Sequence, residues 1–225
     1  MIFQKTRVAF KQERVFQKAR ELALATILVL GKHTLTGMIT AGGKQFQDWS
    51  ATYRMFEEER IDQRSLFAPA ITGVLEMTVQ DVPLFTMMDD TLVRKRGKKI
   101  AGTAWKRDPL GPPFHTNFVW GQRYLQISAA LPDLDISGRA RGIPLDFHHA
   151  PSAVKPRKNA APEAWEEYKI QQKKCKISSV GKARLAELRK QVPDRKIVCS
   201  VDGGFTNKEF TVVNLSLKFD YSIYV

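Results

Sequence analysis

Cysteine is scarce in this sequence, and its scarcity argues against two ways of stabilising a fold. The chain has two cysteines in 225 residues, Cys175 and Cys199, and they lack the spacing of metal ligands. A disulfide framework and a zinc module are therefore not expected, and the four histidines do not complete a zinc site. So few cysteines suit a protein of the reducing cytoplasm.

Long apolar runs are also missing. The longest, residues 22–31 (LALATILVLG), is shorter than the ~20 residues that a membrane-spanning helix requires. We expect it to form a buried helix. The first 20 residues lack the apolar core and the small-residue cleavage site of a secretory signal. The sequence therefore predicts a cytoplasmic protein without a membrane partner.

Acidic residues are the third shortage. There are 23 Asp and Glu against 36 Lys and Arg, so the formal net charge is +13 and the pI is about 9.8. An excess of this size attracts polyanions, with nucleic acid as the leading partner and an anionic membrane surface as the weaker alternative. The rest of the composition, 43% hydrophobic and 26% charged, is that of a globular protein with one large or two small domains.

The first 80 residues are predicted to be mostly helical. Apolar residues recur at helical spacing in residues 15–30 (VFQKARELALATILVL). Thr34 and Ser50 are candidate N-caps, with a break between them at Gly42. This layout fits a helix-turn-helix, but a plain helical bundle is the favoured interpretation.

From Val82 onward the pattern predicts strands. Residues 82–90 (VPLFTMMDD) form a short apolar run that ends in acid, as expected where a buried central strand reaches the open edge of its sheet. Further strands are expected at 98–106 and 115–132, and the three would form an antiparallel meander. Irregular structure is then expected at 133–162, a long polar helix at about 163–191 and a buried strand at 196–201. This order predicts an α/β fold with a mixed sheet.

Two of these strands deliver a carboxylate at their carboxyl ends, Asp89 after the first and Asp202 after the last. If the strands are neighbours, the carboxylates converge, and their mutual repulsion favours a divalent cation that prefers oxygen ligands, Mg²⁺ or Mn²⁺. Such a site suits phosphoryl transfer. A basic run follows Asp89 and is expected to lie along an anionic substrate backbone: Arg94, Lys95, Arg96, Lys98 and Lys99. The plainer alternative is an exposed cluster of opposite charges.

Four segments resemble, in order, parts of bacterial insertion-sequence transposases of the DDE superfamily endonuclease group. They are FTMMDDTLVRKRGKKIAG, RDPLGPPFHTNFVWGQRYLQIS, PLDFHHAPSAVKPRKNA and VDGGFTN, within a likeness that spans roughly residues 20–208. The resemblance implies a ribonuclease H-like core at 81–208, preceded by the helical region at 1–80. It also implies that Asp89, or less favourably Asp90, is the first catalytic acid and that Asp202 is the second.

The resemblance further implies an activity and its partners. These transposases cut DNA at the ends of a mobile element and transfer the strand into target DNA with the help of Mg²⁺ or Mn²⁺. The partners implied are therefore transposon ends and target DNA, and self-association into a homo-oligomer is left open.

The sequence departs from the family's pattern near its end. The family needs a third acid, usually Glu, on a helix well beyond the second, but this chain ends 23 residues after Asp202 and Glu209 is too close to serve. Residues 209–225 form a tail that does not resemble the family. We therefore expect a truncated, inactive copy with an incomplete active site. The alternatives are a DNA-binding remnant without catalysis and, less favoured, a basic structural or RNA-associated protein.

Several other residues have a structural and a functional interpretation. Lys155, Arg157 and Lys158 lie in a Pro-rich segment that is either a solvated linker or a phosphate-contacting loop. Trp105, Trp120 and Tyr124 are expected to pack on the sheet rather than to stack on bases, Asp108 to shape a turn, and Cys199 to be a small buried apolar residue.

Overall fold

The computed structural model describes residues 2–58, 60–97, 99–108, 110–112, 114–115, 117–132 and 139–205. The chain forms two compact units, Met1–Gly73 and Val74–Val225, and helix α5 (Gln63–Met77) runs across the boundary between them. The tail expected at 209–225 lies outside the described residues. None of the described helices is long and apolar enough to cross a membrane.

The first unit is helical, as predicted. It contains α1 (Ile2–Lys5), a 3₁₀ turn η1 (Thr6–Ala9), α2 (Glu13–Leu28), α3 (Leu35–Ala41), α4 (Ser50–Glu57) and the beginning of α5. The predicted N-cap at Thr34 is confirmed, because its hydroxyl accepts a hydrogen bond from the Gly37 N–H. At the second candidate, Ser50 is the first residue of α4 and Trp49 occupies the cap position.

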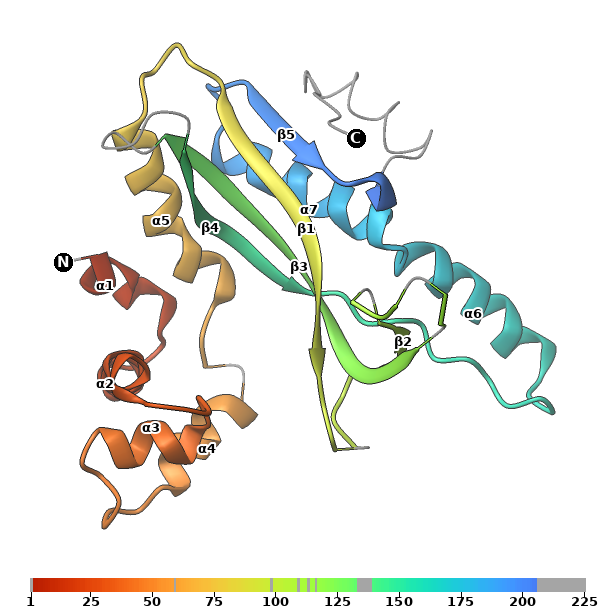
Figure 1. Ribbon diagram of the computed structural model, residues 1–225, viewed down its shortest axis with the longest axis horizontal. Helices are drawn as coiled ribbons and strands as arrows, with labels where there is room; N and C mark the ends of the chain where they lie inside the picture. The colour runs from red at the N-terminus through yellow and green to blue at the C-terminus, as the bar shows by residue number, and fades with distance from the viewer. Residues whose placement is uncertain are drawn as a thin grey trace. The chain divides into compact units, whose positions relative to one another are not determined.

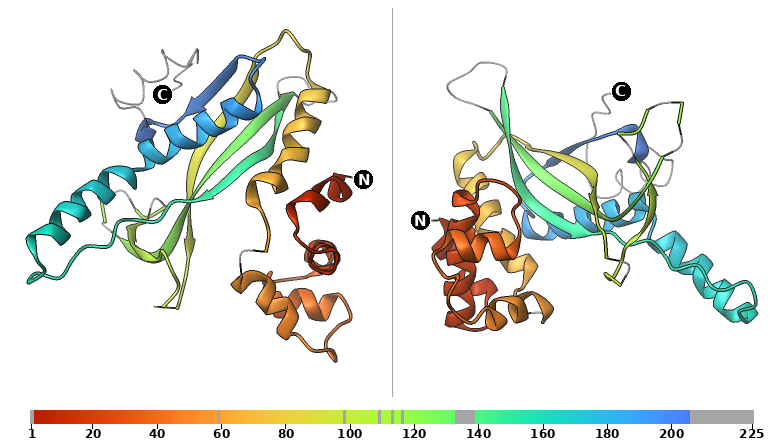
Figure 2. Two further views of the ribbon diagram at one scale, coloured as in Figure 1. Left: turned by 180° about the vertical axis from the view of Figure 1, so that it is seen from behind. Right: turned by 60° about the horizontal axis from the view of Figure 1, so that its bottom comes forward.

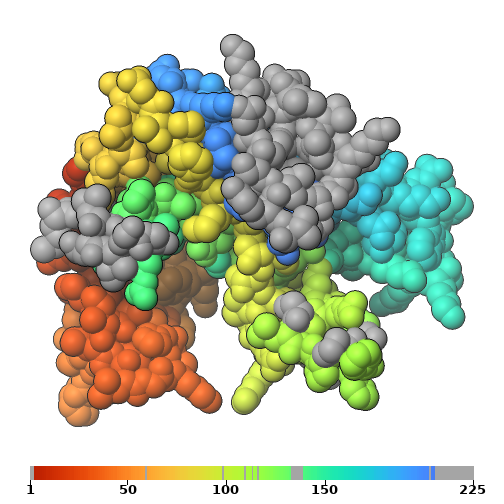
Figure 3. Space-filling model, turned by 45° about the horizontal axis from the view of Figure 1, so that its top comes forward, coloured from red at the N-terminus to blue at the C-terminus, as the bar shows by residue number. Residues whose placement is uncertain are grey.

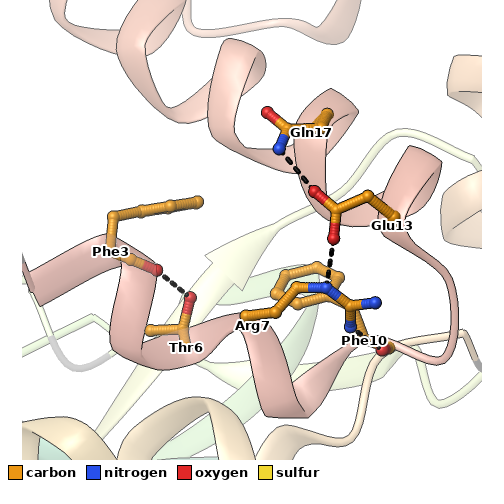
Figure 4. A network of polar contacts seen from close by, with 6 residues as sticks. All are labelled: Phe3, Thr6, Arg7, Phe10, Glu13 and Gln17. Atoms are coloured by element: carbon orange, nitrogen blue, oxygen red, sulfur yellow. Dashed lines mark hydrogen bonds and ion pairs between the residues drawn. The ribbon is translucent and has the colours of Figure 1, made fainter.

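The core of this unit is built around Phe16, which is fully buried. Its ring stacks on Phe3 and meets Phe10 edge to face, with centroids 5.7 and 5.5 Å apart. Arg7 closes this cluster at the surface, where its guanidinium lies over the Phe16 ring. The same guanidinium donates to the Phe10 carbonyl at 2.6 Å and pairs with Glu13 (Figure 4). The N-terminal turn is therefore anchored to α2 by both packing and polar contacts.

The apolar run at 22–31 is not the buried helix that its composition predicts. Leu22 and Ala25 are buried, but Leu24, Ile27 and Leu28 are 57%, 79% and 61% exposed. The run lies on α2, where the helical period turns only one stripe of residues toward the core. A continuous apolar sequence on a helix therefore leaves its remaining residues at the surface.

The second unit contains a five-stranded mixed sheet, which confirms the predicted α/β class (Figure 1). Its strands are β1 (Leu84–Arg94), β2 (Ala104–Arg107), β3 (Phe118–Pro132), β4 (Ala140–His149) and β5 (Ile197–Val201). The order is β2-β3-β1-β5, with β4 pairing β3 as well. Strands β1 and β3 are antiparallel, β3 and β4 are antiparallel, and β5 runs parallel to β1.

Helix α7 (Ile177–Gln191) covers one face of this sheet (Figures 1 and 2). Helix α6 (Pro162–Lys174), which precedes α7, extends from the N-terminal end of α7 beyond the sheet. Helix α7 passes close to the sheet at Gly181, where an added Cβ would lie 3.0 Å from the Cε atom of buried Met88. Arg184 ties α7 to β4 through two hydrogen bonds to the buried Asp146 carboxylate, of 2.7 and 2.8 Å. Helix α6 has no buried residue.

The strand predictions need three corrections. Strand β1 does not end at the acids but continues to Arg94, because its ladder with β3 extends from Thr86 to Arg94. Strand β2 is confined to Ala104–Arg107, since Gly102 adopts a left-handed φ of 71°. The expected meander is wrong as well, because β1 pairs with β3 and not with β2.

Two further elements differ from the prediction for residues 133–191. Strand β4 lies where irregular structure was expected, and its Pro144 sits beside a register shift in the ladder with β3, where a proline is tolerated. The polar helix expected at 163–191 is two helices, separated at Cys175 and Lys176, and the extended ψ of 136° at Lys176 marks the break.

Candidate metal and nucleic-acid site

The two acids singled out by the sequence lie on neighbouring strands. The parallel register of β1 and β5 pairs Leu84 with Ile197 and Met88 with Val201. Asp89 follows Met88 and Asp202 follows Val201, so the two acids lie side by side at the same level of the sheet. Both are exposed. This arrangement follows from the chain path, because the parallel pairing brings the end of β5 beside the middle of β1.

A tight turn orients the Asp202 side chain. Residues Gly203–Phe205 form a 3₁₀ turn directly after β5, and the Asp202 carboxylate accepts the Gly204 N–H at 3.0 Å while its carbonyl accepts the Phe205 N–H at 3.1 Å. Phe205 is fully buried and anchors the turn. This glycine-containing turn therefore holds the carboxylate at the end of the strand.

Asp90 is a third carboxylate in this region. Its backbone N–H donates to the Asp89 carboxylate at 2.8 Å, and its side chain points to the opposite face of β1 from that of Asp89, because side chains alternate along a strand. Burial raises the pKa of Asp90, and the negative charges of Asp89 and Asp202 raise it further, against the opposing effect of Arg123. Asp90 is therefore electrostatically coupled to both of the other acids.

Two basic residues beside Asp90 were missed by the sequence analysis. The positive charges of Arg123 on β3 and Lys106 on β2 both act on Asp90 and oppose the rise in its pKa. The Arg123 guanidinium donates to the Cys175 carbonyl at 3.2 Å, and Lys106 contacts the Ser152 hydroxyl. Burial, together with the charge of Arg123, lowers the pKa of Lys106. The sequence clue to Arg123 was its position on a predicted strand, directly before the mostly apolar residues YLQIS.

The basic run after Asp89 begins on β1 and continues into the turn toward β2. Arg94 is the last residue of β1, and its guanidinium pairs with the buried Asp108 carboxylate at 2.7 Å. Asp108 also accepts the Leu110 N–H at 3.1 Å, which confirms that it shapes the loop. The Lys95 N–H donates to the Trp120 carbonyl at 2.9 Å. Arg94 thus has a structural partner as well as an exposed side.

The rest of the run is exposed where the structure describes it. Arg96 and Lys99 are exposed and Lys95 is partly exposed, whereas Lys98 lies outside the described residues. The turn that carries them follows directly on the strand of the acids, and it is held to the sheet by a hydrogen bond of 3.0 Å from the Trp120 indole N–H to the Gly97 carbonyl. The structure therefore connects the basic run and the acids through one strand, β1.

The second basic segment lies elsewhere in the same unit. Lys155, Arg157 and Lys158 are exposed in the connection between β4 and α6, which runs beside α6 and away from β5 (Figures 1 and 2). The Lys155 ammonium lies 5.9 Å from the centroid of the Trp165 ring on α6, a cation–π contact. This connection offers positive charge along the exposed α6 helix, not at the acids.

Carboxylates are the metal ligands that this region offers. Asp89 and Asp202 provide oxygen ligands of the kind that Mg²⁺ and Mn²⁺ prefer, whereas the Asp90 side chain lies on the other face of β1. Within the part of the chain that the structure describes, no three or more His, Cys, Asp or Glu side chains are grouped so as to hold a metal ion. The arrangement is therefore a carboxylate pair with a coupled neighbour.

Comparison with known proteins gives one distant structural similarity to report. No family model matches the chain, and no curated protein matches it. Among solved structures, it is similar to a chain of the cryo-EM structure of a piggyBac transposase synaptic complex with hairpin DNA, with a TM-score of 0.37 and 14% sequence identity. The similarity covers 99% of this chain and 38% of that chain.

Proposed function

We propose that the unit 74–225 is a DDE-type transposase core that binds a divalent cation through Asp89 and Asp202 and binds DNA. The observation that carries this proposal is the parallel pairing of β1 with β5, which sets the two acids at the same level of adjacent strands. Two carboxylates on neighbouring strands can hold a divalent cation of the kind that serves phosphoryl transfer. The resemblance of the sequence segments to the transposase family supports the same assignment.

The topology supports a ribonuclease H-like core. Strands β1, β3 and β4 form an antiparallel series, α6 and α7 follow, and β5 then joins the free edge of β1 in parallel. The acids of the proposed site lie on the first and last strands of this series, in the order that the resemblance implies. The small strand β2 is an addition at the far end of the β1–β3 pair.

The donor set fits Mg²⁺ or Mn²⁺. Both ions prefer carboxylate oxygens, and a cation shared by Asp89 and Asp202 would offset the repulsion between them. An ion held there would activate water and stabilise negative charge on a phosphodiester. The residues around the acids have separate roles. The Gly203–Phe205 turn orients Asp202, and the positive charges of Arg123 and Lys106 offset the negative charge of Asp90.

DNA is the proposed partner. The net charge of +13 supplies a long-range attraction to phosphates, and the exposed part of the basic run lies on the turn that follows β1. Phosphate contacts from this turn would place the DNA backbone along the strand that carries Asp89. The Lys155–Lys158 segment would extend the contact along α6.

A nicking assay separates a catalytic from a non-catalytic role. The chain and its Asp89→Asn variant are incubated with supercoiled plasmid in Mn²⁺, and DNA binding is measured in parallel by fluorescence anisotropy. Nicking that disappears in Asp89→Asn supports a catalytic site in this chain. Mn²⁺-dependent binding without nicking supports the second candidate, a DNA-binding protein without catalysis. Absence of both metal and DNA binding would contradict the proposal.

A further inference from the structure

An aromatic ribbon lies beyond the acids, at the far end of the β1–β3 pair. We use the name β2–β3 ribbon for β2 (Ala104–Arg107) and the four residues of β3 that pair with it, 118–121. Within it Trp105 pairs with Trp120, and their rings meet edge to face with centroids 5.6 Å apart. The Trp120 indole is in turn held by the Gly97 carbonyl. Trp105 is therefore held in position from behind.

Its front is open. Trp105 is 66% exposed, and Phe118, two residues before Trp120 on the same strand face, is 55% exposed. Arg107 pairs with Phe118 across the two strands and is exposed too. One face of the ribbon thus presents two aromatic rings and a guanidinium to the surroundings. Trp105 packs on Trp120 and Tyr124 packs on Phe147, as expected for residues on the sheet, but most of the Trp105 ring remains exposed.

The charge around these rings is almost entirely positive. Residues 94–108 contain one acid, Asp108, and its carboxylate is already paired with Arg94 and buried. The exposed cations beside the ribbon include Arg96, Lys99 and Arg107. In the space-filling view the end of β1, the basic turn and β2 gather in one projecting lobe, in yellow-green and green (Figure 3). An anionic partner with flat apolar groups complements this surface.

We propose that the β2–β3 ribbon binds unpaired nucleotides of DNA, with Trp105 as a stacking platform and the basic turn as the phosphate-binding side. Exposed aromatic rings flanked by cations are the features by which proteins bind single strands, since a base stacks on the ring while its phosphate binds the cation. Bases within a duplex cover each other's faces, so they do not offer the ring a surface. This proposal rests on the proposed function for its substrate class, but it does not involve the metal site.

The test compares single-stranded with duplex DNA in the absence of metal. A labelled 12-nucleotide oligo(dT), and its duplex with oligo(dA), are titrated with the protein in EDTA and followed by anisotropy. Stacking on one aromatic side chain accounts for roughly a 5- to 150-fold effect on affinity, so Trp105→Ala should weaken single-strand binding by about that factor. Duplex binding should change less than about twofold, because it depends on phosphate contacts.

Two further variants keep the outcome interpretable. Trp105→Phe preserves a ring and should retain single-strand affinity within about threefold, even if Trp105→Ala weakens the packing on Trp120. Phe46→Ala removes a ring that is 95% exposed in the first unit and should leave the affinity unchanged. Equal losses for single-stranded and duplex DNA, or a Trp105→Ala protein that binds oligo(dT) like the parent, would overturn the proposal. Because EDTA removes divalent ions, failure of the metal site would leave this result intact.

Discussion

Replacing Arg195 by methionine should destabilise the strand pair that carries the two acids. Arg195 lies just before β5, is 7% exposed, and its guanidinium binds the segment that leads into β1. It donates to the Thr78 hydroxyl at 2.6 Å, to the Val82 carbonyl at 2.8 and 3.2 Å from two nitrogens, and to the Val79 carbonyl. Directly after these contacts the Leu84 N–H donates to the Lys196 carbonyl at 2.8 Å, which starts the register.

The size of the effect follows from these contacts. A hydrogen bond from a charged donor contributes about 1.5–3 kcal/mol, and methionine would remove the donors to three acceptor groups. Water can replace part of this loss, because the segment is at the surface, with the Val79 side chain 71% exposed. We therefore expect a loss of roughly 3 kcal/mol, or about 6–12 °C in the melting temperature of a unit of this size.

Thermal unfolding followed by circular dichroism measures this change. Arg195→Lys is the matched control: it keeps the positive charge but not the planar fork that reaches several acceptors at once, so its melting temperature should fall between those of the parent and Arg195→Met. If Arg195→Met melts within about 2 °C of the parent, the guanidinium does not stabilise the start of the β1–β5 pair and the reasoning is refuted.

Three further predictions concern the same unit. Burial raises the pKa of the Cys199 thiol from 9.0 to about 11. The contribution of the neutral thiol to stability is therefore complete below pH 9 and is lost as the pH rises to 11. Between pH 9 and 11 the unfolding free energy of the parent and of Cys175→Ala should fall more steeply than that of Cys199→Ala, by up to ~1.4 kcal/mol per pH unit. A thiol reagent should modify Cys175, which is partly exposed, in the native protein but Cys199 only after unfolding, and rapid labelling of both would contradict the assigned burial. Gly102→Ala should lower the urea midpoint of unfolding by the equivalent of about 1–3 kcal/mol. The reason is that Gly102 has a φ of 71° and that an added Cβ would clash with the Cε1 atom of His149. An unchanged midpoint would count against this backbone geometry.

The strands rich in aromatic and β-branched residues could be predicted from the sequence. The expected strands at 115–132 and 196–201 correspond to β3 (Phe118–Pro132) and β5 (Ile197–Val201), and Cys199 is buried as expected. Strand β4 could not be predicted, because it begins with ARGIP, in which arginine, glycine and proline hide the strand pattern. It is stabilised by its long ladder with β3, and such pairing is a tertiary contact that local sequence does not report.

The candidate site was predictable to a similar degree. The sequence indicates that Asp89 and Asp202 adjoin strands, but their shared level depends on which strands are neighbours, and pairing is decided by the whole sheet. The coupling of Asp90 to the other acids and the presence of Arg123 beside it depend on which face each side chain takes. The exposure of Trp105 depends on the same alternation, which places its ring on a sheet face that lies open.

Binding of Mn²⁺ tests the central claim most directly. Free Mn²⁺ is measured by electron paramagnetic resonance during titration of the parent, of Asp89→Asn, of Asp202→Asn and of Asp194→Asn, a control that replaces an exposed aspartate before β5. The account predicts that the parent and Asp194→Asn bind the ion alike, and that each of the other two variants loses at least about tenfold in affinity. Equal Mn²⁺ binding by all four proteins would contradict a metal site shared by Asp89 and Asp202.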